Sequence, residues 1–162
     1  TSIVLLYGGV FMYYTKKIQL ELKENEYNAL IAYIEDYQQY LKAMVDFMHR
    51  SGNIQYNSFQ FPTSIQHKNR HYLYRLALKK YRAELHKKSF QYNRCTSFVF
   101  STFFISENLL TMKLGRAANK NTICATLIDT DMTHDWRSEN MIRLDILRKD
   151  QIWYACFTIY TS

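Results

Sequence analysis

Hydrophobic residues in the first third of the chain change from a period of two to a period of three and four. In residues 16–22, isoleucine and leucine alternate with charged or polar residues, which is typical of a half-buried strand. In residues 27–48, apolar residues recur at steps of three and four, which predicts a long amphipathic helix. Asn25 is a suitable N-cap for this helix, and Ser51-Gly52 is a suitable end.

A second helix is predicted after the single proline. Thr63 or Ser64 can cap it, and it extends to about residue 87. One line along this helix is apolar, with Tyr74, Leu78, Tyr81 and Leu85. The adjacent line is cationic, with Lys68, His71, Arg75, Lys79, Arg82 and His86. If the apolar line packs against the long helix, the cationic line forms a ridge at the edge of that contact.

From residue 90 onward the pattern is that of β-structure. Five segments rich in β-branched and aromatic residues follow one another, most of them separated by polar or glycine-containing turns. They are residues 96–104, 108–114, 122–128, 141–147 and 152–160. The turn at residues 148–151 joins the last two as a hairpin. Both faces of the last strand are apolar, which predicts burial on two sides. Helices and strands in this order predict an α+β fold.

The positive charge of the chain is local. The formal net charge is +7, but residues 67–94 hold nine lysines and arginines against Glu84 alone. The nine are Lys68, Arg70, Arg75, Lys79, Lys80, Arg82, Lys87, Lys88 and Arg94. Like charges four residues apart destabilise a helix, so we expect a ligand to offset them. Such a block indicates a polyanionic partner, with nucleic acid first and an anionic membrane surface second.

Composition argues against several other classes of protein. Cys95, Cys124 and Cys156 form no CxxC pair and are odd in number, which favours a reducing compartment and buried thiols. The histidines lack HExxH or similar spacing, so no metal site is predicted. Residues 1–14 are apolar but shorter than the ~20 residues of a membrane-spanning helix. We interpret them as a leader or an extra strand.

Three further groups of residues have a structural and a functional interpretation. Tyr74 and Tyr81 are on the apolar line and are predicted to pack in the core, whereas Tyr92 is open to base stacking. The acidic loop with Asp129, Asp131, His134 and Asp135 matches no metal or catalytic spacing and is predicted to be a polar loop. Lys113, Arg116 and Lys120 fit phosphate contact and plain solvation equally well.

The order of these elements resembles the N-terminal half of TnpB, the transposon-encoded relative of type V CRISPR effectors. The resemblance is carried by residues 16–22 with the following helix, by NLLTMKLG at 108–115, and by RKDQIWYACFTI at 148–159. It implies a wedge domain, which is a small antiparallel β-barrel interrupted by a helical recognition insertion. The implied division is 16–23 with 89–162 as the barrel, 24–88 as the insertion and 1–15 as the leader or extra strand.

The resemblance also implies a function without catalysis in this chain. The partners would be guide RNA and target DNA, bound as RNA or as an RNA–DNA heteroduplex by backbone and shape. The family's RuvC carboxylates and zinc-finger cysteines have no counterpart here, so we expect no catalytic residue and no cofactor, with divalent metal only in a nuclease domain beyond the final strand. Gln151 stands where the family commonly has glycine, which puts the turn geometry in question.

The sequence therefore predicts the nucleic-acid-binding part of a TnpB-like RNA-guided endonuclease, in the cytoplasm of a prokaryotic or mobile-element host. The expected binding residues are Lys68, Arg70, Arg75, Lys79, Lys80, Arg82, Lys87, Lys88, Tyr92, Arg94, Lys113 and Arg116. Two alternatives remain open. One is a nuclease-free RNA-binding regulator, and the other is a small interaction protein whose cationic helix lies on a membrane or an acidic partner.

Overall fold

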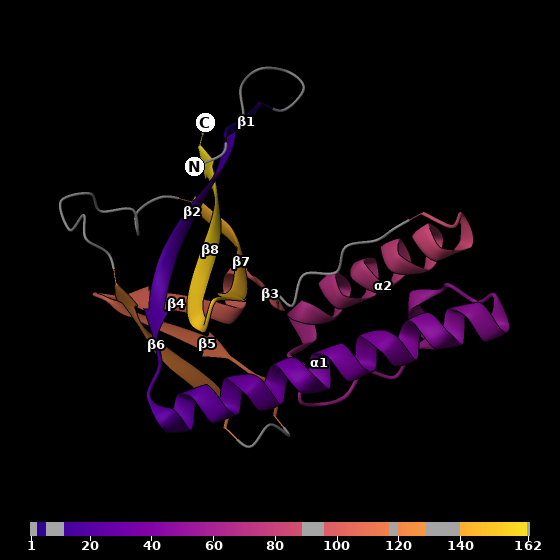
Figure 1. Ribbon diagram of the computed structural model, residues 1–162, viewed down its shortest axis with the longest axis horizontal. Coiled ribbons are helices and arrows are strands. Elements are labelled where there is room, and N and C mark those ends of the chain that lie inside the picture. Colours follow the sequence, from indigo (N-terminus) through magenta and orange to yellow (C-terminus); the bar gives the residue numbers. More distant parts are fainter. Residues whose placement is uncertain (1–2, 6–11, 89–95, 117–119, 129–139, 162) are drawn as a thin grey trace.

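The computed structural model describes residues 3–5, 12–88, 96–116, 120–128 and 140–161 (Figure 1). The strands are β1 (Ile3–Leu5), β2 (Met12–Glu21), β3 (Thr96–Val99), β4 (Phe103–Ser106), β5 (Leu109–Lys113), β6 (Thr122–Ile128), β7 (Asn140–Lys149) and β8 (Ile152–Thr161). The helices are α1 (Glu24–Ser51) and α2 (Arg70–Leu85), with 3-10 turns η1 (Tyr56–Ser58), η2 (His67–Asn69) and η3 (Phe100–Thr102). Two helices inserted between strands of an antiparallel sheet confirm the α+β prediction.

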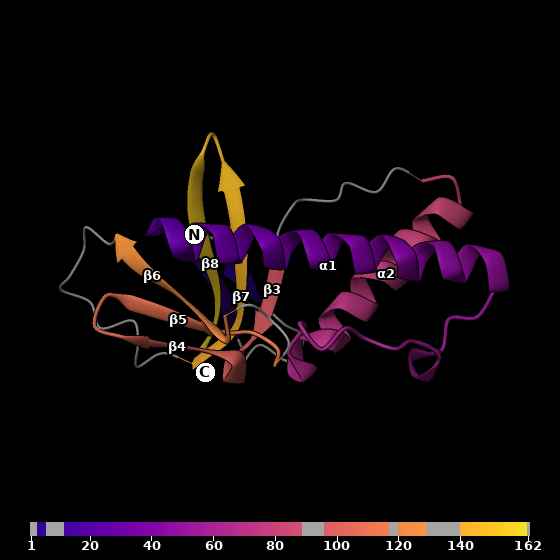
Figure 2. The same ribbon diagram turned by 90° about the horizontal axis from the view of Figure 1, so that it is seen from below.

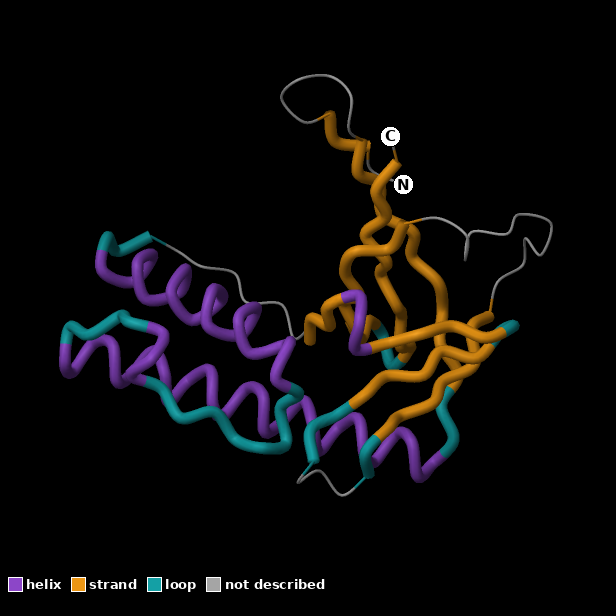
Figure 3. The backbone as a smooth tube through the Cα atoms, turned by 180° about the vertical axis from the view of Figure 1, so that it is seen from behind, coloured by secondary structure: helices purple, strands orange, loops and turns teal. Residues whose placement is uncertain are grey.

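The sheet curls round on itself. Its strand order is β3-β7-β8-β2-β6-β5-β4, and β1 pairs with β2 beside this path. The two end strands, β3 and β4, are consecutive in the chain and are joined only by the three residues of η3. The ends of the sheet therefore lie close together, as the strands in Figure 3 show. No ladder of described residues joins β3 to β4, so the sheet forms an open barrel.

The inside of the curled sheet is an apolar core. Alternate residues along each strand face inward, since successive side chains of a strand point to opposite faces. The fully buried ones include Phe98, Leu110, Ile123, Leu144 and Phe157. Phe103 of β4 contacts Phe157 of β8 across this interior, with 6.0 Å between ring centroids. The end strand β4 thus packs on β8 across the interior, and this contact stabilises the curled shape of the sheet.

Helix α1 belongs partly to this core and partly to a projection from it. Its N-terminal half crosses the sheet, and its C-terminal half extends beyond it (Figure 2). Tyr27 makes an edge contact with Trp153, and Tyr33 stacks on Phe98 with 5.6 Å between centroids. The buried residues of the sheet and of both helices form one hydrophobic cluster. The helical insertion is therefore anchored in the barrel core.

Helices α1 and α2 run side by side in the same direction, away from the sheet (Figure 1). Tyr33 of α1 lies beside Asn69, which precedes α2, while His49 near the end of α1 contacts Tyr81 near the end of α2. Parallel helices require a return segment, and residues 53–66 supply it. Phe59 and Phe61 of this segment pack on α1. We call α2, the return segment and the distal half of α1 the helical arm.

The helix boundaries correct two predictions. Helix α1 begins at Glu24 with Lys23 as its N-cap and no side-chain capping bond, so Asn25 is not the cap. Its end is as predicted, because Gly52 adopts a left-handed φ of 71° there. Helix α2 begins at Arg70 and not after Thr63 or Ser64. The Ser64 carbonyl instead accepts a hydrogen bond from Gly115 of the barrel, at 3.0 Å, so the chain there is bound to the sheet.

The β-region also departs from the prediction in two places. Residues 96–104 are not one strand, because η3 interrupts them where the chain crosses from one end of the sheet to the other. Strand β8 is not buried on two sides. Trp153, Ala155, Phe157 and Ile159 are buried, while the residues between them are only half-buried. Strand β1 pairs with β2, which supports the extra-strand interpretation of the N-terminal residues.

Candidate nucleic-acid interface

Helix α2 packs through a face that the sequence did not single out. Leu73 and Ala77 are fully buried, and Tyr74, Leu78 and Tyr81 pack beside them against the core. The predicted apolar line is therefore only partly correct. Leu85, its last member, is 53% exposed. The small side chain of Ala77 allows α2 to approach its neighbours closely. The packed face is therefore centred on Leu73 and Ala77, about 100° around the helix from the predicted line.

Most of the basic residues of α2 and its flanking turns face solvent. Lys68, which precedes the helix, and His71, Arg75, Lys79, Arg82 and His86 are all exposed, and we call them the cationic face. At 100° per residue they lie opposite Leu73 and Ala77 and next to the packed line that contains Tyr74, so the row borders the packed side of the helix. The rise of 1.5 Å per residue makes the row from His71 to His86 about 22 Å long.

No described carboxylate neutralises this face. Glu84 is the single acidic residue of α2, and its side chain is turned to α1, where His49 Nε2 lies 2.6 Å from Glu84 Oε2. None of the six residues of the cationic face forms a salt bridge with any residue that the structure describes. The positive charge is therefore available to an external anion.

The aromatic residues near the cationic face are used in packing. The His71 ring stacks in parallel on Tyr56, with 4.3 Å between centroids, and the Arg75 guanidinium lies 5.9 Å from the Tyr72 ring. The Tyr74 hydroxyl donates to the Ile54 carbonyl at 2.5 Å, and Tyr81 packs on His49. Tyr74 and Tyr81 are thus packing residues, as predicted. These contacts also fix the helical arm as a rigid support for the charges.

The remaining predicted binding residues of this region differ in their surroundings. Arg70 is half-buried, and its Nε donates to the Ile65 carbonyl at 3.2 Å, so it holds the return segment. Lys80 is half-buried, whereas Lys87 and Lys88 are exposed beyond the end of α2. Several predicted residues lie outside the described part of the chain: Tyr92, Arg94, Cys95, Asp129, Asp131, His134 and Asp135.

The barrel contributes a second set of cations. Lys113 and Arg116 are exposed, but Lys120 forms an ion pair with Glu26. The other carboxylate oxygen of Glu26 accepts from the backbone N–H of Cys124 at 2.9 Å, so Glu26 ties α1 to β6. Nothing in the sequence pattern marked Glu26 for this role. The loop with Arg116 follows Gly115, which bonds to Ser64 at the base of the helical arm.

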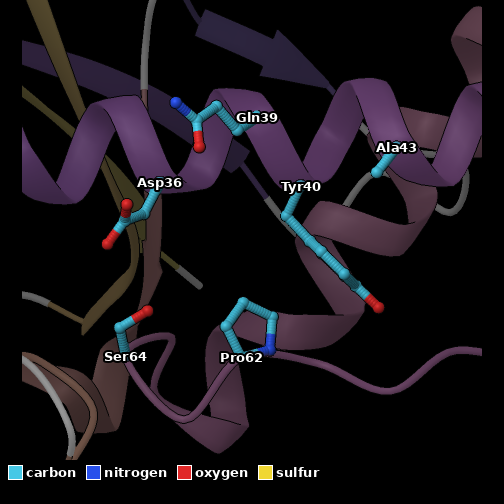
Figure 4. Close-up of a pocket in the computed structure, with 6 residues that line it drawn as sticks. All are labelled: Asp36, Gln39, Tyr40, Ala43, Pro62 and Ser64. Carbon is cyan, nitrogen blue, oxygen red and sulfur yellow. The ribbon is translucent and has the colours of Figure 1, made fainter.

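A shallow trough lies between α1 and the return segment. It has a volume of about 450 Å³ and is lined by Asp36, Gln39, Tyr40, Ala43, Pro62 and Ser64 (Figure 4). These residues come from α1 and the return segment, and none comes from α2. The described residues hold no group of three His, Cys, Asp or Glu that could bind a metal ion. Cys124 and Cys156 are free and half-buried, and burial raises the pKa of Cys156, which disfavours the reactive thiolate.

Comparison with models of protein families gives no match, and no curated protein matches the sequence. In the described part of the chain, neither helix combines the length and the apolar character needed to cross a membrane.

Proposed function

We propose that the chain binds structured RNA through the cationic face of α2, as the guide-RNA and heteroduplex recognition part of a TnpB-like RNA-guided DNA endonuclease. The observation that carries this proposal is the exposed row of basic residues with no described carboxylate beside it. Phosphates bound by such a row release counterions, which gives an affinity independent of sequence and strongly dependent on salt.

The apolar side of α2 is packed inside the protein, and this favours nucleic acid over a membrane surface as the partner. A helix that lies in a membrane interface inserts its apolar face among the lipids. In α2 that face is already buried at Leu73 and Ala77, and α1 is the main element on which α2 packs. Among the large apolar side chains of α2, all of which the structure describes, only that of Leu85 is exposed. The solvent-facing side of α2 therefore offers an external partner mainly positive charge, which suits binding to a phosphate backbone.

The test is a salt titration of RNA binding with a triple charge reversal, Arg75→Glu, Lys79→Glu and Arg82→Glu. The logarithm of the association constant falls with the logarithm of salt concentration with a slope of about −0.9 for each neutralised phosphate of a duplex. If each of the three side chains neutralises one phosphate, the slope should become shallower by about 2.7 units. Affinity should fall for all RNA sequences alike, because phosphates carry no sequence information.

A matched control separates the cationic face from net charge. The control reverses three exposed lysines elsewhere, with Lys17→Glu, Lys42→Glu and Lys149→Glu, and changes the total charge by the same amount. It should keep most of the affinity and a slope near that of the unmodified chain. Equal loss in both triple variants, or no loss with the first one, refutes a binding role for the cationic face.

A further inference from the structure

The barrel exposes two phenylalanine rings at the base of the helical arm. Phe100 in η3 is 57% exposed and Phe104 in β4 is 50% exposed. Every described tyrosine and tryptophan, and every other described phenylalanine, is buried or half-buried. Phe103 lies between the two and points into the core, where it contacts Phe157. Two exposed rings on one short segment are thus an exception among the aromatic residues that the structure describes.

Phe100 lies next to the start of the cationic face. The fully buried Asn69 side chain accepts a hydrogen bond from the Val99 backbone N–H at 3.1 Å and another from Thr102 Oγ1 at 3.2 Å. These two bonds hold η3 against η2, the turn that contains Lys68. Phe100 follows Val99 directly, so its ring is placed where the row of basic residues meets the sheet.

The Phe104 ring lies beside a lysine side chain. Lys113 on the neighbouring strand β5 places Nζ 5.9 Å from the centroid of the Phe104 ring. Phe104 pairs with Thr111 in the ladder, and Thr111 is two residues before Lys113, so all three side chains are on one face of the sheet. An exposed ring beside a lysine on an antiparallel sheet is the arrangement in which proteins stack unpaired bases and bind the adjoining phosphates.

We propose that unpaired nucleotides stack on Phe100 and Phe104 where they leave the segment held by the cationic face. This inference rests on the proposed function and deepens it, because it names the ligand as RNA with unpaired bases next to a duplex. The duplex backbone lies along α2, where the aromatic residues are used in packing, and the bases are bound at η3 and β4. The backbone contacts are independent of sequence and the stacking contacts need a free base.

The test compares three RNA hairpins that share one duplex. One has blunt ends, one has an unpaired extension with bases, and one has an abasic extension of the same length. The abasic extension keeps the phosphates, so its difference from the normal extension isolates stacking. Because stacking on an aromatic side chain strengthens binding about five-fold or more per base, the unmodified chain should bind the base-bearing extension at least about five-fold tighter than the abasic one.

Two variants and one control define the outcome. Phe100→Leu with Phe104→Leu keeps apolar side chains of similar burial and should abolish the preference for the base-bearing extension, with no change for the blunt hairpin. Phe100→Tyr with Phe104→Tyr should retain the preference. Ile142→Ala removes a 39% exposed apolar side chain in the bulge of β7 and should change nothing.

The failures of the two proposals are distinguishable. If no hairpin binds with a salt-dependent affinity, the proposed function itself is refuted. If the blunt hairpin binds but the bases of the extension add nothing, or if the leucine variant keeps the preference, the stacking proposal alone is refuted. The second result would leave the exposed rings to a protein partner.

Discussion

The contact between Gly115 and the return segment gives the sharpest test of how the helical arm is held. A Cβ atom added at Gly115 would lie 1.9 Å from the Thr63 carbonyl oxygen and 2.6 Å from the Ser64 carbonyl carbon. Ordinary van der Waals contact begins at 3.4 Å, so Gly115→Ala must separate two backbone segments by about 1.5 Å. Neither is a side-chain end that could rotate away.

The expected loss of stability has two parts. Overpacking of this kind costs about 1–3 kcal/mol, and the hydrogen bond from Gly115 to Ser64 contributes about 1 kcal/mol more. We therefore expect Gly115→Ala to lower the free energy of unfolding by about 2–4 kcal/mol, and Tm by about 5–15 °C in a chain of this length. Urea denaturation followed by circular dichroism measures the first value, and a thermal scan measures the second.

Gly52→Ala is the matched control. Gly52 has a left-handed φ of 71°, but nothing lies within 4 Å of an added Cβ, so alanine there meets backbone strain without a clash. That strain costs about 1–2 kcal/mol. The reasoning is refuted if Gly115→Ala is no more destabilising than Gly52→Ala, because the close approach of the two backbones would then have no energetic consequence.

Two further predictions concern the hairpin and the core. Asp150 and Gln151 both have positive φ, 52° and 71°, so the Gln151→Gly variant should raise the free energy of unfolding by about 0.5–1 kcal/mol in urea denaturation, and equal or lower stability would contradict this. Burial raises the pKa of Tyr33, with Asn69 partly opposing it. Above about pH 10 the unfolded chain releases this proton first, so stability should fall as pH rises. Tyr33→Phe should lose less stability between pH 9 and about pH 11, and an identical loss would exclude Tyr33 as the cause.

The parts of the fold that follow from short-range patterns could be predicted from the sequence. Helix α1 has apolar residues at helical spacing over most of its length and a glycine at its end. Both features determine the conformation of residues close to them in the sequence. The turn at residues 148–151 is likewise local. These elements form where the pattern places them, and the exposure of the basic row from Lys68 to His86 follows in the same way.

The parts that depend on distant residues could not be predicted. Thr63 and Ser64 are typical N-cap residues, but the Ser64 carbonyl accepts a hydrogen bond from Gly115 of the barrel. The chain is bound to the sheet there, and α2 begins only at Arg70. The bulky line with Leu85 looks like the buried side of α2, but parallel packing on α1 favours the small Ala77. Asn69 and Glu26 are polar residues without a motif, and their roles exist only because the fold brings η3 and β6 beside them.

The parallel course of α1 and α2 has a consequence for the electrostatics of the arm. Each helix carries a partial negative charge at its C-terminus, and here both C-termini meet at the outer tip. Arg50, Lys87 and Lys88 are gathered at the same place, so part of their charge compensates the two helix dipoles. An incoming phosphate should accordingly meet the strongest attraction near the middle of α2, around Arg75 and Lys79, and not at the tip where basic residues are most numerous.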